Sequence, residues 1–123
     1  MPDKMDTLKA EQENICSDNA AIRHDVIERV TYLVGKNPEM ATARDWFNAS
    51  AYMVRDHMVD NWMMTSRNYY RKDVKRVYYF SLEFLMGRTL MNSLLNLDLD
   101  EATRKALTSI GVELETIRSM EYD

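Results

Sequence analysis

Cysteine is nearly absent from this 123-residue sequence, which contains only Cys16. A single cysteine cannot form a disulfide within the chain, and it fits a reducing compartment. No run of residues approaches the length and apolarity of a membrane span, and the N-terminal residues lack the apolar core of a secretory signal. These absences predict a soluble cytoplasmic protein with no membrane partner.

Excess charge of one sign is also lacking, since the net charge is only −4. That balance gives no support for a general nucleic-acid-binding surface. Residues 67–76 are a local exception, with Arg67, Arg71, Lys72, Lys75 and Arg76 against Asp73. Tyr69 and Tyr70 lie among these cations, an arrangement that can bind a phosphate-bearing ligand. The same cations can instead be a solvated helix end that complements the helix dipole.

Apolar residues at helical spacing predict that most of the chain is helical. Residues 1–17 lack this periodicity and are expected to form a flexible arm. Ile22, Val26 and Val30 then predict an amphipathic helix, which Gly35 is expected to end. Shorter helices are expected near residues 91–97, 100–110 and 114–120.

Glycine and proline are both missing from residues 42–72. Thr42 and Asp45 have the spacing of a capping box, with aspartate in the usual place of glutamate or glutamine. A helix from this cap can extend to about 45 Å at roughly 1.5 Å per residue. We expect it to carry one apolar stripe from Phe47 to Trp62 and to fray over residues 67–73. Such a long helix requires a large body to pack against.

A second strand is missing, although Val77–Phe80 reads as a short apolar strand. The strand leads through a turn that carries Glu83 to Gly87-Arg88-Thr89, where a new helix is expected to open. An apolar strand leaves backbone amide and carbonyl groups that need a partner in a sheet. The chain is therefore predicted to be part of a larger structure.

The common catalytic motifs are missing too: there is no phosphate loop, nucleophile elbow, metal-ligand spacing or dinucleotide fingerprint. His24 and His57 have no His or Cys one helical turn away with which to share a metal. Glu83 lies between apolar side chains, where an ionised carboxylate is costly. It is either an ion-pair partner of Arg88 or a site carboxylate at the end of a strand. The residues themselves identify no catalytic, cofactor-binding or metal-binding side chain.

Two runs carry a more specific signal: YMVRDHMVDNW at residues 52–62 and NYYRKDVKRVYYFSLEFLMGRTLMNSLLNL at residues 68–97. They resemble the N-terminal region of the glycogen, starch and maltodextrin α-glucan phosphorylases. The resemblance covers roughly residues 20–123 and only the beginning of a family member. It implies an α/β fold, in which this chain is a mostly helical N-terminal fragment with one clear strand. The whole would be a two-domain glycosyltransferase of the B-type, double Rossmann-like fold, with residues 18–123 as the incomplete start of the N-terminal domain.

The resemblance also implies an activity. Phosphorylases transfer a terminal α-1,4-linked glucose from a glucan to inorganic phosphate and release glucose 1-phosphate. Their cofactor is pyridoxal phosphate, whose attachment lysine is not in this segment. Glu83 matches the family's glutamate at the edge of the glucose site and is the one substrate-binding residue carried over. The segment alone is expected to be inactive, and the full-length enzyme is expected to be a homodimer.

Two departures from the family pattern bear on regulation. Ser66 and Arg67 replace the paired glutamines of the nucleotide effector site of animal phosphorylases, although Tyr70 matches that site's tyrosine. Leu85 replaces a tyrosine that is common in animal members. Nucleotide activation is therefore not predicted.

The alternative hypothesis is a free-standing helical interaction module. In that case the basic patch at residues 67–76 engages an acidic partner, and salt releases the complex. The module would unfold cooperatively by itself, whereas a fragment would expose apolar faces.

Overall fold

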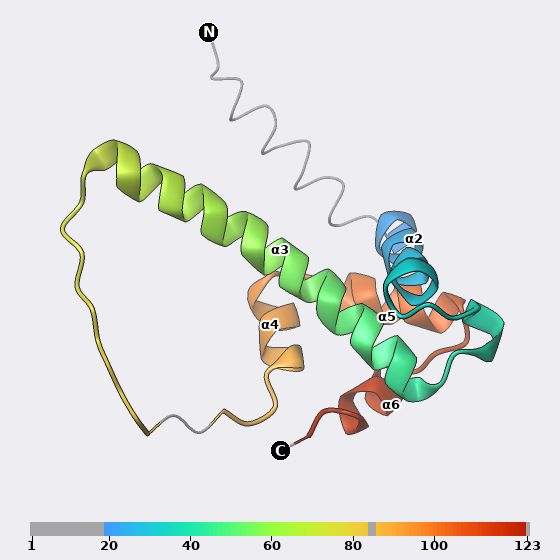
Figure 1. Ribbon diagram of the computed structural model, residues 1–123. Helices are drawn as coiled ribbons and strands as arrows, with labels where there is room; N and C mark the ends of the chain where they lie inside the picture. The colour runs from blue at the N-terminus through green and yellow to red at the C-terminus, as the bar shows by residue number, and fades with distance from the viewer. Residues whose placement is uncertain (1–18, 84–85, 123) are drawn as a thin grey trace, which may run out of the picture.

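A computed structural model describes residues 19–83 and 86–122, so the arm predicted for residues 1–17 lies outside the described part. The described residues are mostly helical (Figure 1). In chain order the elements are α2 (Asn19–Glu28), the π-helix η1 (Arg29–Leu33), the 3₁₀ helix η2 (Pro38–Met40), α3 (Ala43–Lys72), α4 (Leu90–Asn96), α5 (Asp100–Ser109) and α6 (Leu114–Ser119).

The first predicted helix is confirmed, and its last turn is a π-helix. Ile22, Val26 and Val30 are all buried, as their spacing predicts. The amide of Val34 donates to the carbonyl oxygen of Arg29 at 2.9 Å, which is the wider bond of a π-turn. Gly35 follows with a φ of 74°, a left-handed conformation that suits glycine and ends the helix where the sequence predicts.

The predicted capping box opens α3. The amide of Thr42 donates to Oδ2 of Asp45 at 2.8 Å, and the amide of Asp45 donates to Oγ1 of Thr42 at 3.4 Å. The helix continues to Lys72, so the fraying predicted over residues 67–73 is wrong. Asp73 provides the reason, because it adopts a left-handed conformation with a φ of 45° and closes the helix.

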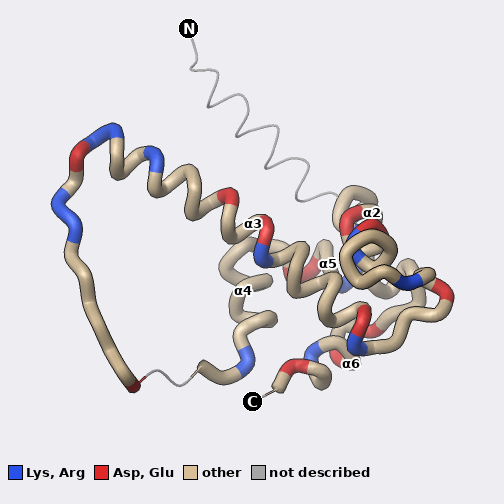
Figure 2. The backbone as a smooth tube through the Cα atoms, viewed as in Figure 1, with Lys and Arg blue, Asp and Glu red and all other residues tan. Residues whose placement is uncertain are grey.

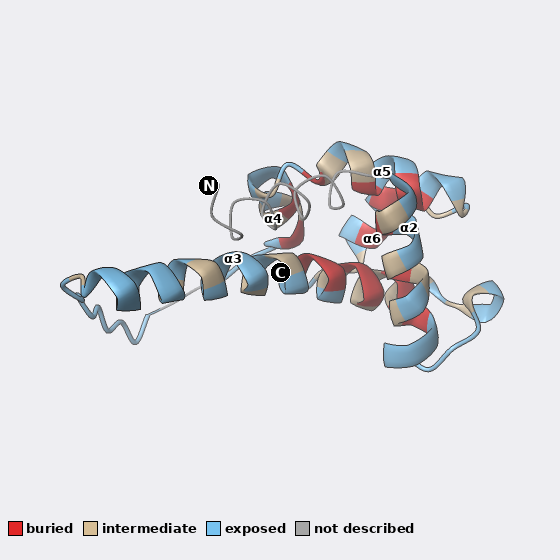
Figure 3. Cartoon of the chain, turned by 90° about the horizontal axis from the view of Figure 1, so that it is seen from above, coloured by how far each residue is buried: buried red, intermediate tan, exposed pale blue. Residues whose placement is uncertain are grey.

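The two halves of α3 have different surroundings. Trp46, Ala49 and Met53 in the first half are buried. Met58 and Trp62 in the second half are exposed, Trp62 to 67%. Figure 3 shows the buried residues of α3 gathered where the other helices meet it, and the rest of the helix projecting away from them. The predicted apolar stripe is therefore buried only along its first half.

The helices after residue 89 complete one core. α2 packs against α5, while α4 and α6 pack against α3. These later helices and the residues between them contribute several buried apolar side chains: Leu90, Leu94, Leu99, Ala106, Leu107, Leu114 and Ile117. Neither α3 nor any other described helix is both long and apolar enough to cross a membrane.

The strand predicted at Val77–Phe80 is not formed. Residues 74–80 have no regular secondary structure, and Val77, Tyr79 and Phe80 are 85 to 89% exposed. The physical reason is that no described segment lies alongside as a second strand, so the backbone has no ladder to join. The described part thus confirms a mostly helical segment, and it contains neither the predicted strand nor a Rossmann-like domain.

Asp45 makes the start of α3 sensitive to acid. Hydrogen bonds from Lys36, at 2.8 Å, and then from Thr42 lower the pKa of Asp45 from 3.8 to about 2. Because the folded pKa lies below the unfolded one, this stabilisation is complete above about pH 4 and disappears as the pH falls towards 2. We expect Asp45→Asn to lower Tm at pH 7 and to flatten the change in Tm between pH 4 and 2, as measured by circular dichroism.

The control for that comparison is Asp60→Asn, because Asp60 is an exposed residue of α3. It is expected to leave both Tm at pH 7 and the acid dependence close to those of the unaltered protein. An Asp45→Asn protein that lost stability between pH 4 and 2 as steeply as the unaltered one would contradict this role of Asp45.

Limited proteolysis tests the exposed connection after α3. Among the described residues, trypsin is expected to cut first after Lys75 or Arg76, which lie in exposed, non-helical backbone. Mass spectrometry of the early fragments would locate the cuts. First cuts after Arg104 or Lys105, which lie within α5, would contradict this picture.

Candidate functional site

Glu83, the site residue predicted from the sequence, lies in the connection between α3 and α4. Its amide donates to Oγ of Ser81 at 3.3 Å, and that hydroxyl donates to the carbonyl oxygen of Glu83 at 3.2 Å. These bonds form a small local turn. Glu83 is exposed and so is Leu82, so the described residues do not form the costly apolar surroundings expected for its carboxylate.

A surface hollow of about 420 Å³ lies where α3 gives way to the connection. It is lined by Tyr69, Val74, Lys75, Arg76, Val77 and Tyr78. The guanidinium of Arg76 lies 4.3 Å from the centre of the Tyr70 ring. A hydrogen bond with Tyr70, and a weaker effect of one with Tyr78, raise the pKa of Arg76 above its ordinary value. The hollow is therefore a basic and aromatic surface.

This surface corresponds to the basic stretch predicted from the sequence, and Figure 2 shows its cations at the end of α3 and along the start of the connection. Arginine and tyrosine together suit a ligand that combines a phosphate with a flat ring. Arg71 and Lys72 also occupy the last turn of α3, where cations complement the helix dipole. Neither Ser66 nor Arg67 lines the hollow, and we assign no nucleotide site to it.

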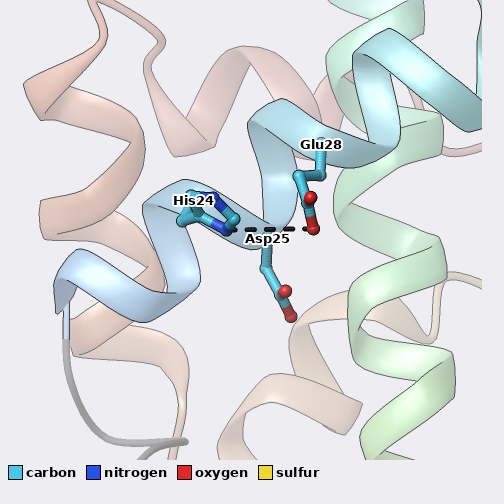
Figure 4. Close-up of side chains that lie close together, drawn as sticks. All are labelled: His24, Asp25 and Glu28. Atoms are coloured by element: carbon cyan, nitrogen blue, oxygen red, sulfur yellow. Dashed lines mark ion pairs between the residues drawn. The ribbon is translucent and has the colours of Figure 1, made fainter.

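A second group of titratable side chains lies on α2 (Figure 4). His24 Nδ1 is 3.8 Å from Oε2 of Glu28, one turn along the helix, and Asp25 lies beside them. The sequence pattern did not predict this group, because neither histidine has a second His or Cys one helical turn away. The guanidinium of Arg29 already pairs with Asp25 at 3.2 Å and with Asp56 of α3 at 2.9 Å. We therefore assign this cluster to the joining of α2 and α3 and place no metal there.

His57 belongs neither to the hollow nor to the group on α2. His57 lies on α3 and is half-buried. Cys16 lies outside the described residues. The described chain thus places Glu83 and the basic hollow on the same exposed connection, and it surrounds neither with a closed pocket.

Comparison with known proteins indicates a family, which the geometry of the described residues does not. No protein-family profile matches the chain. Over 106 residues, or 86% of its length, it is 42% identical to the brain form of glycogen phosphorylase from Homo sapiens and equally to that from Rattus norvegicus. Over 88 residues, or 72% of its length, it is 47% identical to the muscle form from Ovis aries. The chain spans about 13% of the brain-form relatives and 10% of the muscle form. The resemblance read from the sequence is confirmed.

Proposed function

From its similarity to glycogen phosphorylases over most of its length, we propose that this chain is the first part of an α-glucan phosphorylase. Residues 18–123 would begin the N-terminal domain of a longer enzyme with two Rossmann-like domains. The whole enzyme would use inorganic phosphate to cleave terminal α-1,4-glucosidic bonds of glycogen or maltodextrin and release glucose 1-phosphate. The similarity is the single observation that carries this proposal.

The exposed connection supports it independently. The apolar side chains of Val77, Phe80 and Leu82 are exposed. Leaving apolar surface in contact with water is unfavourable in free energy, so another part of the protein is expected to cover it. Burial of one such side chain contributes on the order of 1.5–3 kcal/mol. In the longer enzyme, residues 77–80 would join a sheet that satisfies their backbone and covers these side chains. The chain by itself would then be inactive.

Glu83 would follow that strand at its carboxyl end, where open α/β sheets place their ligands. We propose that its carboxylate lies at the rim of the glucose site and accepts hydrogen bonds from sugar hydroxyls. Its exposure in the present chain agrees with a side chain that faces a cleft. The residue would bind and orient the sugar and would not transfer a proton.

The cofactor would be pyridoxal phosphate, which supplies a phosphate group beside the substrate phosphate when bound. Under this proposal its lysine and the phosphate-binding cations belong to the part of the enzyme outside residues 1–123. The compartment would be the cytoplasm, with which a sequence containing one cysteine agrees.

We further propose that the full-length enzyme is a homodimer to which the second half of α3 contributes. The exposed residues Met58, Trp62 and Met63 form an apolar surface there. Tryptophan and methionine are enriched in protein interfaces, and a buried tryptophan often dominates the binding energy.

The alternative function, a free-standing interaction module, draws support from the hollow at the end of α3. Its cations and tyrosines are exposed, as an acidic partner requires. A complex that dissociates as salt is raised from about 0.05 to 0.5 M would favour this alternative.

The activity assay decides between the two functions. We expect the full-length protein to release glucose 1-phosphate from glycogen or maltodextrin in the presence of inorganic phosphate, and the 123-residue chain to release none. Glu83→Gln is expected to lower kcat/KM for the glucan about tenfold or more, because hydrogen bonds to a charged acceptor are lost.

The matched control is Glu113→Gln, which removes the same charge from an exposed residue whose side chain caps no helix. It is expected to keep kcat/KM within about twofold. A full-length protein that releases no glucose 1-phosphate from either glucan would refute the proposed activity.

The dimer is tested by Trp62→Arg in the full-length protein. A charge placed in an apolar interface is expected to raise the dimer dissociation constant at least about tenfold, as measured by sedimentation equilibrium. Asn61→Arg adds the same charge to the neighbouring exposed position and is the control. Equal weakening by both variants, or an unaltered protein that is monomeric at all concentrations, would rule out this interface.

A further inference from the structure

Glu121, near the end of the described chain, holds the first turn of α4. Its Oε1 accepts from the amide of Thr89 at 2.7 Å and from the amide of Leu90 at 3.0 Å. Its Oε2 also lies 3.2 Å from the amide of Leu90. These bonds join residues that are more than thirty positions apart in the sequence.

The bonds replace a cap that α4 lacks. The first amides of a helix have no partner within it, and a side chain at the N-cap usually accepts from them. Thr89 occupies the N-cap of α4, but its hydroxyl makes no such bond. A carboxylate is the stronger acceptor, and its negative charge also suits the positive end of the helix. Glu121 therefore fixes where α4 begins.

Tyr122, the next residue, contacts the start of α3. The guanidinium of Arg44 lies 4.4 Å from the centre of the Tyr122 ring, and it also lies 5.4 Å from that of Phe47. Arg44 belongs to the first turn of α3. Residues 121–122 thus connect the start of α3 with the start of α4. The connection that carries Glu83 enters α4 at this point.

We propose that Glu121 is a positioning residue for the segment that carries Glu83, and hence for the rim of the glucose site. This inference rests on the proposed function of Glu83. Glu83 precedes Thr89 by only six residues, so the place where Thr89 is held limits where Glu83 can lie. Glu121 itself would not touch the glucan. It would act by holding the backbone at Thr89 and Leu90.

The test uses substitutions of Glu121 and Glu83, singly and together, in the full-length protein. Glu121→Ala is expected to raise KM for the glucan about fivefold to tenfold and to keep kcat within about twofold, because a displaced Glu83 weakens binding before and during the reaction equally. Glu121→Gln keeps one acceptor oxygen, so its KM is expected to lie between those of the unaltered protein and Glu121→Ala. In a Glu83→Gln background, Glu121→Ala is expected to change KM by less than about twofold, because the two residues act in sequence.

Glu113→Gln is again the charge-matched control and is expected to leave KM unchanged in both backgrounds. Equal changes in KM with and without Glu83→Gln would overturn the proposal, because Glu121 would then act by another route. An unchanged KM in Glu121→Ala, with faster amide exchange at Thr89 and Leu90, would reduce Glu121 to a helix cap.

Hydrogen exchange separates failure of this inference from failure of the proposed function. In Glu121→Ala, the amides of Thr89 and Leu90 are expected to exchange at least about tenfold faster, and the peptide spanning residues 77–83 at least about threefold faster. If the full-length protein has no phosphorylase activity, the proposed function fails while this measurement still decides whether Glu121 holds the segment. Unchanged exchange in residues 77–83 would overturn the positioning role.

Discussion

Burial of the first half of α3 is the interaction on which the other described helices depend. Met53 is fully buried and Trp46 nearly so, and α2, α4 and α6 all pack against this helix, with α5 closing over α2. The capping box of Thr42 and Asp45 fixes where the helix begins, and Lys36 ties the preceding loop to the same carboxylate. The buried residues of α3 all lie between Asp45 and Val54, close to this start. The core therefore forms at one end of α3.

The core does not cover the other end of α3 or the connection that follows it. Trp62 and the side chains from Val77 to Phe80 are exposed, and residues 74–80 pair with no strand among the described segments. Burying extended backbone costs free energy unless a neighbouring strand pairs with its amide and carbonyl groups. Residues 77–83 belong to the second run that resembles phosphorylases, and the core of this chain leaves them exposed. This arrangement is consistent with a chain that spans only about 13% of its relatives.

The proposed site includes residues from both the uncovered connection and the covered core. Glu83 lies on the uncovered connection, whereas Glu121 and Tyr122 fasten the end of that connection to the covered core. A binding residue at a domain edge needs such support, because catalytic and binding groups must be held to within a fraction of an ångström. The basic hollow beside Tyr70 has no comparable support from the core, and its walls are built largely from the exposed connection.

The sequence by itself determined the local features of this protein. Helical spacing located the helices, the Thr42 and Asp45 pair located the start of α3, and Gly35 located the end of the first helix, because each depends on residues within one or two turns. The motif around Glu83 identified the family for the same reason. Only the tertiary structure decided that half of α3 is uncovered, that residues 77–80 form no strand here, and that Glu121 caps α4. These depend on contacts between distant residues, or on their absence, and a pattern of neighbours does not contain them.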